Sequence, residues 1–391
     1  MHLQRKEINK AHTSWALLLL SYTLATTLHA HVYYEHYCNP EQQVSAHILE
    51  VDASIVRIEA VHAVGFSTDR EDVLSIAQRT HAYAAINGGF FRRGGRYNGC
   101  PLGILKINNT LYADLFLERG ALAWARDTGA LIDIIKTSCT VAFGENFVAI
   151  DRINQPRADN EIILYTSAFR PTTLTHATGI EIIVDNNKIV KIQKNQGNVH
   201  IPPNGFVISC GSAVIPDFIE NLDLEKPVAI QYKFGNNETW EKAEFMIGAT
   251  PSLILNGQEL TASQMARELA SGTRVAITSD EVPADFHDDQ QSSWLINGQH
   301  PRTAVGITKD NKWIFVVVDG RNTECCAGMS LPELAHFMKE RGCVSAINLG
   351  GGGDSTMVIN DIIVNKTSGA STGFKDTRAR PVSDAICIYI D

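Results

Sequence analysis

Short apolar runs separated by polar turns dominate the chain, and they predict many strands and few helices. Residues 180–184 and 189–193 illustrate the pattern, because the turn Asn186-Asn187 joins two apolar runs as in a β-hairpin. Between residues 104 and 234 only one short helical segment, near residues 217–222, interrupts this pattern. Residues 313–318 form a continuous apolar, β-rich run, which indicates a strand buried on both faces.

The strongest helical pattern begins at Ser330. Ser330 and Glu333 fit a capping box, and Pro332 stands in the first turn, where its missing N–H group costs no hydrogen bond. Apolar residues then recur every three or four positions, and Gly342 offers a left-handed end. Residues 68–71 are a second capping box. The helix that they predict has the inner face Val73, Ile76 and Ala77.

Residues 344–349 form another apolar run, so the C-terminal third is predicted to be strand, helix, strand. Such a unit is normally parallel and right-handed, which brings the C-terminal ends of both strands to one edge of the sheet. The loop of residues 319–321 and the loop of residues 350–356 should therefore lie side by side, where open α/β sheets bind ligands. We predict an α+β fold with mixed β-rich sheets, a C-terminal βαβ unit and few helices, in one domain over residues 44–391.

These two loops carry residues that suit an anionic ligand. The glycines at 350–353 let the backbone approach a ligand closely, and their amides can form an anion-binding nest. The loops also bring an arginine, Arg321, and two carboxylates, Asp319 and Asp354, to the same edge. The alternative is that both loops are ordinary turns.

Other polar segments each allow two interpretations. Asn87 could bond a ligand and Phe90 could pack on a sugar, or Phe90 and its neighbour could belong to the core. Arg302 precedes a buried strand, where an unpaired guanidinium is costly, so it needs a carboxylate or a ligand phosphate. The basic residues 92–96 could contact an anionic substrate or form a solvated loop. The acidic residues 279–293 are interpreted as a surface loop rather than a metal site, because their spacing fits no EF-hand.

Composition excludes some functions. The chain has 391 residues, 44% hydrophobic and 20% charged, which is ordinary for a globular protein. Its formal net charge is -9 and it has no basic stripe, so we do not expect it to bind nucleic acid.

The N-terminus resembles a secretory signal peptide, over residues 1–30. A basic start precedes a short apolar run with polar interruptions and then Ala30, a small residue at a cleavage point. The alternative is an uncleaved anchor. We expect a secreted or periplasmic protein whose mature chain has no stable membrane span. For an exported protein, the eight cysteines predict some disulfides. We do not expect the neighbours Cys325 and Cys326 to pair with each other, so one of them could pair with another loop.

Several segments together resemble the phosphodiester glycosidase family. They are AINGGFF at 85–91, HPRTAVGIT at 300–308, WIFVVVDGR at 313–321, AGMSLPELAHFMKERGC at 327–343, AINLGGGGDSTMV at 346–358 and RPVSDAI at 380–386. The family commonly has Asn-Leu-Asp-Gly-Gly-Gly-Ser-Ser-Thr in the glycine loop. Here Gly350 stands in place of that aspartate, and Asp354 stands in place of the first serine.

The resemblance implies hydrolysis of a sugar-1-phosphodiester, with a carbohydrate or sugar phosphate as substrate and no cofactor. A phosphomonoester leaves without a strong acid, since its second pKa is about 6. The site then needs cations and amides on the phosphate and a carboxylate near the sugar. The catalytic candidates are Asp319, Asp354 and Arg321, with the base and nucleophile roles and any metal left open. The substrate-binding candidates are Asn87, Gly88, Phe90, Arg302, Thr303, Asn348, Gly351, Gly352, Gly353, Ser355 and Thr356.

Overall fold

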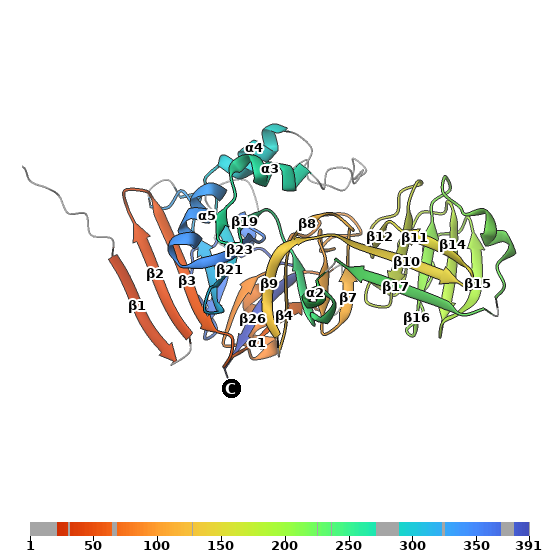
Figure 1. The fold of residues 1–391 in the computed structure, drawn as a ribbon, viewed down its shortest axis with the longest axis horizontal. Coiled ribbons are helices and arrows are strands. Elements are labelled where there is room, and N and C mark those ends of the chain that lie inside the picture. Colours follow the sequence, from red (N-terminus) through yellow and green to blue (C-terminus); the bar gives the residue numbers. More distant parts are fainter. Residues whose placement is uncertain are drawn as a thin grey trace, which may run out of the picture.

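The structure is a computed structural model that describes residues 22–29, 32–64, 69–126, 128–224, 226–235, 237–270, 289–322, 325–368 and 379–390. Five sheets are arranged along an elongated molecule (Figure 1). An eight-stranded sheet lies at one end, two five-stranded sheets lie in the middle, and a β-rich lobe forms the other end. The prediction of several sheets with few helices is confirmed.

The eight-stranded sheet joins the N-terminal strands to the C-terminal third. Every neighbouring pair in it is antiparallel. In sheet order its strands are β1 (Tyr22–His29), β2 (Val32–Asn39), β3 (Val44–Asp52), β22 (Lys312–Val318), β21 (Arg302–Thr308), β23 (Cys343–Asn348), β19 (Ser252–Leu255) and β20 (Gln258–Glu259).

Two five-stranded sheets follow. The first contains β25 (Ile362–Ile363), β24 (Met357–Ile359), β5 (Ala84–Asn87), β26 (Asp384–Tyr389) and β4 (Arg57–His62). The second contains β7 (Thr110–Ala113), β6 (Leu105–Ile107), β18 (Phe245–Gly248), β8 (Arg119–Ala125) and β9 (Thr128–Ile135). Side chains of these two sheets and of the eight-stranded sheet form one large apolar core, in which Trp313 packs edge-on to Trp124 with ring centroids 5.5 Å apart.

The lobe at the far end holds the remaining strands. One of its sheets contains β11 (Asn146–Ile150), β10 (Thr137–Phe143) and β17 (Val228–Phe234). The other contains β12 (Arg152–Ile153), β13 (Ile162–Thr166), β16 (Gly205–Cys210), β14 (Ile180–Asp185) and β15 (Lys188–Lys194). β12 and β13 pair in parallel, and the Asn186-Asn187 hairpin predicted from the sequence joins β14 to β15.

Helices are few and short. They are α1 (Val73–Thr80), α2 (Glu238–Lys242), α3 (Ala262–Ala270), α4 (Asp289–Asn297) and α5 (Leu331–Glu340), with 3-10 turns η1 (Asp217–Asn221) and η2 (Gly352–Asp354). α5 has the predicted Ser330–Glu333 capping box, and Gly342 follows it at φ +83°. α1 begins later than predicted, after Asp72, and its predicted inner face is buried. Glu71 bonds Ser75 and Arg79, and residue 68 of the predicted capping box lies outside the described ranges. No helix within the described ranges is long and apolar enough to cross a bilayer.

The predicted βαβ unit needs a correction. β22 and β23 run in the same direction, but they are not neighbours, because β21 pairs antiparallel with both of them. The apolar run of β22 suggested a parallel sheet, yet it reflects burial by other layers. Trp313, Phe315 and Val317 face the large core, while Ile314, Val316 and Val318 face the core beneath α5. The start of β21 therefore lies between the two loops that we expected side by side.

The structure also differs from the expectations for the N-terminus and for the cysteines. Residues 22–29, which we assigned to a signal peptide, form β1, and residues 1–21 lie outside the described ranges. Cys325 pairs with its neighbour Cys326, so the expectation that these two do not pair with each other is wrong. The other six cysteines, all within the described residues, are unpaired thiols, and five of them are buried.

Asp114 is a buried acid that should make stability depend on pH. Its side chain is 3% exposed and accepts a hydrogen bond from the Phe116 amide at 2.8 Å, and burial raises the pKa of the carboxyl to about 6. The folded chain then binds this proton more tightly than the unfolded chain. The free energy of unfolding therefore decreases as pH rises from about 4 to about 6.

We expect Asp114→Asn to remove this loss, which is on the order of 2–3 kcal/mol between pH 4 and pH 7. Urea unfolding at both pH values measures it, with Asp361→Asn in an exposed turn as the matched control. An unchanged difference between the two pH values in the Asp114 variant would contradict the assignment.

Candidate active site

The glycine loop connects β23 of the eight-stranded sheet to β24 of a five-stranded sheet, and Asn87 holds it in place. The Asn87 amide donates to the Gly350 carbonyl at 2.6 Å. Its oxygen accepts from the Thr303 hydroxyl at 2.8 Å and from the Thr356 amide at 3.2 Å. Asn87 is 1% exposed. We expected it to bond a ligand, and Thr303 to do the same, but both side chains bond the protein and fix the loop.

Glycine is needed where the backbones cross. A Cβ on Gly88 would lie 1.8 Å from Oδ1 of Asp384, whose carboxylate accepts a hydrogen bond from the Gly89 amide. A Cβ on Gly350 would lie 2.9 Å from the Gly89 carbonyl oxygen. Gly88 and Gly350 are therefore packing positions. The site has no room for the aspartate that the family commonly carries at position 350.

Asp354 carries the carboxylate of this loop. It is 7% exposed, and Arg380 donates to its Oδ1 at 2.9 Å. Burial raises the pKa of Asp354 above its ordinary value, although the charge of Arg380 acts in the opposite direction. A carboxylate with a raised pKa is a stronger proton acceptor than an exposed one.

Four arginines surround this carboxylate. Arg380 and Arg93 act electrostatically on Asp354, on Arg70 and on Arg321. Burial lowers the pKa of Arg70 and of Arg321, and the charge of Arg380 lowers both further. Around Arg70, the charges of Asp354 and Asp69 oppose those of Arg380 and Arg93. An anionic ligand would relieve the repulsion among the arginines.

The loop backbone is only partly available to such a ligand. The Gly352 amide donates to the Pro301 carbonyl at 2.9 Å, so this amide is not free for the predicted anion-binding nest. The amides of Gly351 and Gly353 remain candidates. Gly352 adopts φ +66°, and a Cβ there would lie 2.8 Å from the Arg321 guanidinium. Arg321 therefore reaches across the start of β21 to the glycine loop, which restores the predicted meeting of the two loops.

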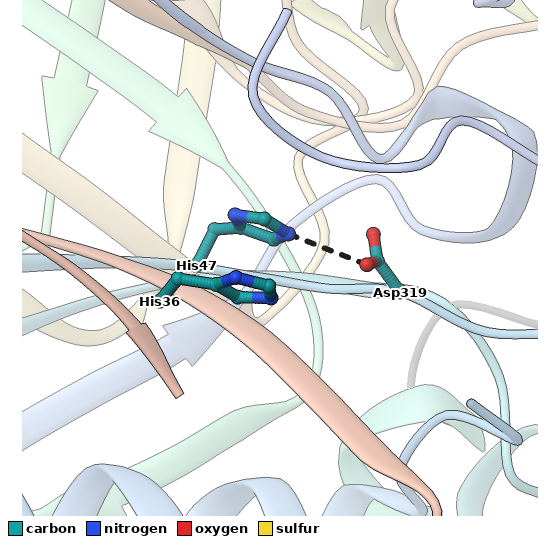
Figure 2. Close-up of side chains that lie close together, drawn as sticks. All are labelled: His36, His47 and Asp319. Atoms are coloured by element: carbon teal, nitrogen blue, oxygen red, sulfur yellow. Dashed lines mark hydrogen bonds and ion pairs between the residues drawn. The ribbon is translucent and has the colours of Figure 1, made fainter. Parts of the chain in front are cut away.

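Asp319 has a different environment from Asp354. It is 2% exposed; its Oδ1 accepts from the Lys366 amide at 2.8 Å, and its Oδ2 accepts from the Ser45 hydroxyl at 2.7 Å. His47 Nε2 lies 3.3 Å from the same Oδ2 (Figure 2). Burial opposes ionisation, but these contacts outweigh it and lower the pKa of Asp319 below its ordinary value.

Arg302 is an internal residue. Its side chain is 2% exposed and donates to the carbonyls of Met329 at 2.8 Å, Leu295 at 2.7 Å and Gly298 at 2.9 Å. Three carbonyls thus take the place of the carboxylate or phosphate that we expected. Arg302 holds α4 and the turn before α5 against the sheet.

Three polar atoms remain candidates for ligand contacts. Asn348 Oδ1, Ser355 Oγ and Thr356 Oγ1 are buried and have no hydrogen-bond partner among the described residues. Phe90 is half-buried and lines a cavity with Leu102 and Gly248, whereas Phe91 belongs to the core around α1. The acidic residues 279–288 lie outside the described ranges, and residues 289–297 form α4.

Sequence reasoning missed Arg70 and Arg380. Arg70 was hidden inside a predicted capping box. Arg380 lies in the resembling segment RPVSDAI, so that segment was the available signal. Arg93 belongs to the basic stretch whose role we left open.

Comparison with known proteins identifies the family of this chain. The profile of the phosphodiester glycosidase family matches residues 178–389, more than half of the chain. The chain belongs to the phosphodiester glycosidase family. The matched region contains the glycine loop, Arg321 and Arg380, but not Arg70 or Arg93.

Individual relatives are distant. An uncharacterised protein of Rickettsia conorii is 25% identical over 273 residues, which are 68% of this chain and 85% of that protein. The N-acetylglucosamine-1-phosphodiester alpha-N-acetylglucosaminidase of Mus musculus is 32% identical over 97 residues, 25% of this chain and 18% of that enzyme. A hypothetical protein from Synechocystis shares the fold with a TM-score of 0.76 at 18% identity, covering 95% of this chain and 64% of that chain.

The packing at position 350 predicts the effect of restoring the family's aspartate. Because a Cβ there approaches the Gly89 carbonyl at 2.9 Å, Gly350→Asp should displace the loop and lower the melting temperature. The control is Gly129→Asp, where a Cβ meets nothing closer than 3.8 Å. A Gly350 variant that melts like the wild type would contradict this account.

Proposed function

We propose that the chain is an exported hydrolase that cleaves the glycosidic C–O bond of a sugar-1-phosphodiester in a glycan or glycoconjugate. Membership of the phosphodiester glycosidase family supports the reaction class. The observation that carries the proposal is the cluster of four arginines that interact with Asp354 on the glycine loop. A diester phosphate bears one negative charge and the released monoester bears more, so the cluster favours the product-like leaving group.

Each group of the site has a role in this proposal. Arg321 and Arg70 hold the phosphate oxygens, with the amides of Gly351 and Gly353. Asp354, whose pKa burial raises, accepts the proton of the water that attacks the anomeric carbon. Arg380 keeps Asp354 oriented at 2.9 Å. The sugar hydroxyls contact Asn348, Ser355 and Thr356. Asp319 is the second carboxylate at this edge of the eight-stranded sheet.

Export is part of the proposal and rests on the basic start and apolar run of residues 1–30. β1 is the outermost strand of its sheet, so cleavage after Ala30 would leave β2 as the edge. Mass spectrometry of the secreted chain reports the cleavage point.

Two alternative functions each have a specific observation in their favour. Gly350 in place of the usual aspartate favours a non-catalytic module that binds anionic glycans in the same place. The arginine cluster would equally serve a phosphodiesterase that cuts the P–O bond.

Hydrolysis in oxygen-18 water separates these chemistries. We expect the released sugar, not the phosphate, to carry the label, and we expect Asp354→Asn to reduce kcat roughly 100-fold or more because a general base is lost. Label in the phosphate would identify a phosphodiesterase. Binding without turnover across a panel of sugar-1-phosphodiesters would identify the binding module.

The phosphate contact has its own prediction. Arg321→Ala should lower kcat/KM by roughly 10- to 100-fold, because one charge-assisted hydrogen bond to phosphate is lost. Arg267→Ala on the exposed face of α3 is the matched control. Equal kinetics for both variants would remove Arg321 from the site.

A further inference from the structure

A polar cluster lies where β2, β3 and β22 pair, beside the large apolar core. The register pairs His36 with His47 and Cys38 with Ser45. The Asp319 amide continues the ladder to the Ser45 carbonyl at 2.9 Å. Because alternate residues of paired strands share a face, the register itself brings these side chains together.

The donor atoms of this cluster converge. His36, His47 and Asp319 each offer one nitrogen or oxygen, and these atoms lie within 4.8 Å of one another (Figure 2). The two imidazoles stack with centroids 4.3 Å apart and an interplanar angle of 9°. Cys38 adds a sulfur 3.3 Å from His36 Nε2.

Two of the separations are close to those around a tetrahedral ion. Ligand atoms that lie 2.0–2.3 Å from zinc are about 3.3–3.6 Å apart at the tetrahedral angle. His47 Nε2 lies 3.3 Å from Asp319 Oδ2, and Cys38 Sγ lies 3.3 Å from His36 Nε2. Each pair is therefore close to one edge of such a tetrahedron.

We propose that His36, His47 and Asp319 bind a divalent ion of the zinc class, and that the Cys38 side chain, whose sulfur is not within 4.8 Å of all three donor atoms, turns toward the ion to supply a thiolate as the fourth ligand. Two imidazoles, a carboxylate and a thiolate are a donor set that selects zinc over magnesium or calcium. His47 and Asp319 are each 2% exposed, whereas His36 and Cys38 are half-buried. The ion can thus reach the cluster from the His36 and Cys38 side.

Neighbouring groups orient these ligands. The Tyr34 hydroxyl lies 2.8 Å from His47 Nδ1, and the Lys366 amide donates to Asp319 Oδ1 at 2.8 Å. Without the ion, a proton joins His47 Nε2 to Asp319 Oδ2. With the ion bound to Nε2, that proton is carried on Nδ1 instead, Nδ1–H donates to the Tyr34 oxygen, and the Cys38 thiol releases its proton to solvent.

The test uses the full chain, stripped with a chelator and titrated with Zn²⁺ and Co²⁺. We expect one equivalent per chain, tetrahedral cobalt absorption bands, and a thiolate-to-cobalt charge-transfer band that Cys38→Ser abolishes. His36→Ala should bind zinc at least roughly 100-fold more weakly, and Tyr34→Phe roughly 10-fold more weakly. His336→Ala, an exposed histidine on α5, should bind zinc like the wild type.

Metal stoichiometry and affinity are the readouts, so the result stands whether or not the chain hydrolyses a phosphodiester. Circular dichroism confirms that each variant is folded, and a zinc-dependent rise in the wild-type melting temperature gives a second measurement that needs no variant. Substoichiometric zinc with no melting shift would overturn the proposal. So would a folded His36→Ala variant with wild-type affinity.

Discussion

The geometry of the site depends on the hydrogen bonds of one buried side chain, Asn87. It joins its own segment to Thr303 and to both ends of the glycine loop, at Gly350 and Thr356. Each of these hydrogen bonds is buried. Losing one leaves a polar group with neither a protein nor a water partner, which lowers the free energy of unfolding by roughly 1–3 kcal/mol. The bonds fix the glycine loop, and the loop in turn fixes Asp354 among the arginines.

The relocation of the loop carboxylate follows from this constraint. The Asn87 bond draws the Gly350 carbonyl against the chain at Gly88 and Gly89, and that approach leaves no space for a side chain at position 350. Asp354, four residues later, instead lies at the 3-10 turn η2 and meets Arg380. The two acids of the edge then differ, because burial raises the pKa of Asp354 while hydrogen bonds lower the pKa of Asp319.

The sequence predicted local features well and long-range partners poorly. The cap of α5, the buried faces of β22 and the hairpin of β14 and β15 follow from residue pattern alone, since neighbours in sequence determine them. The insertion of β21 between β22 and β23 does not, because strand order depends on distant pairing. Arg302 was taken for a phosphate ligand because sequence does not show that a backbone carbonyl can replace a charged partner. Its partners are the carbonyls of Leu295 and Gly298, which are 7 and 4 residues away, and that of the more distant Met329.

Some residues of the site were likewise predictable from the sequence, and others were not. Asp354 and Arg321 lie in loops that follow apolar strands, so their meeting was predictable from sheet geometry. Arg70 comes from a separate part of the chain, before α1, and only the fold brings its charge to Asp354. The arginine cluster is therefore a property of the tertiary structure.

The most direct measurement is a crystal structure with a non-hydrolysable sugar-1-phosphonate diester. The account predicts phosphonate oxygens within hydrogen-bonding distance of Arg321 and the Gly351 or Gly353 amide, with the anomeric carbon facing Asp354. A phosphonate bound away from the glycine loop would contradict it.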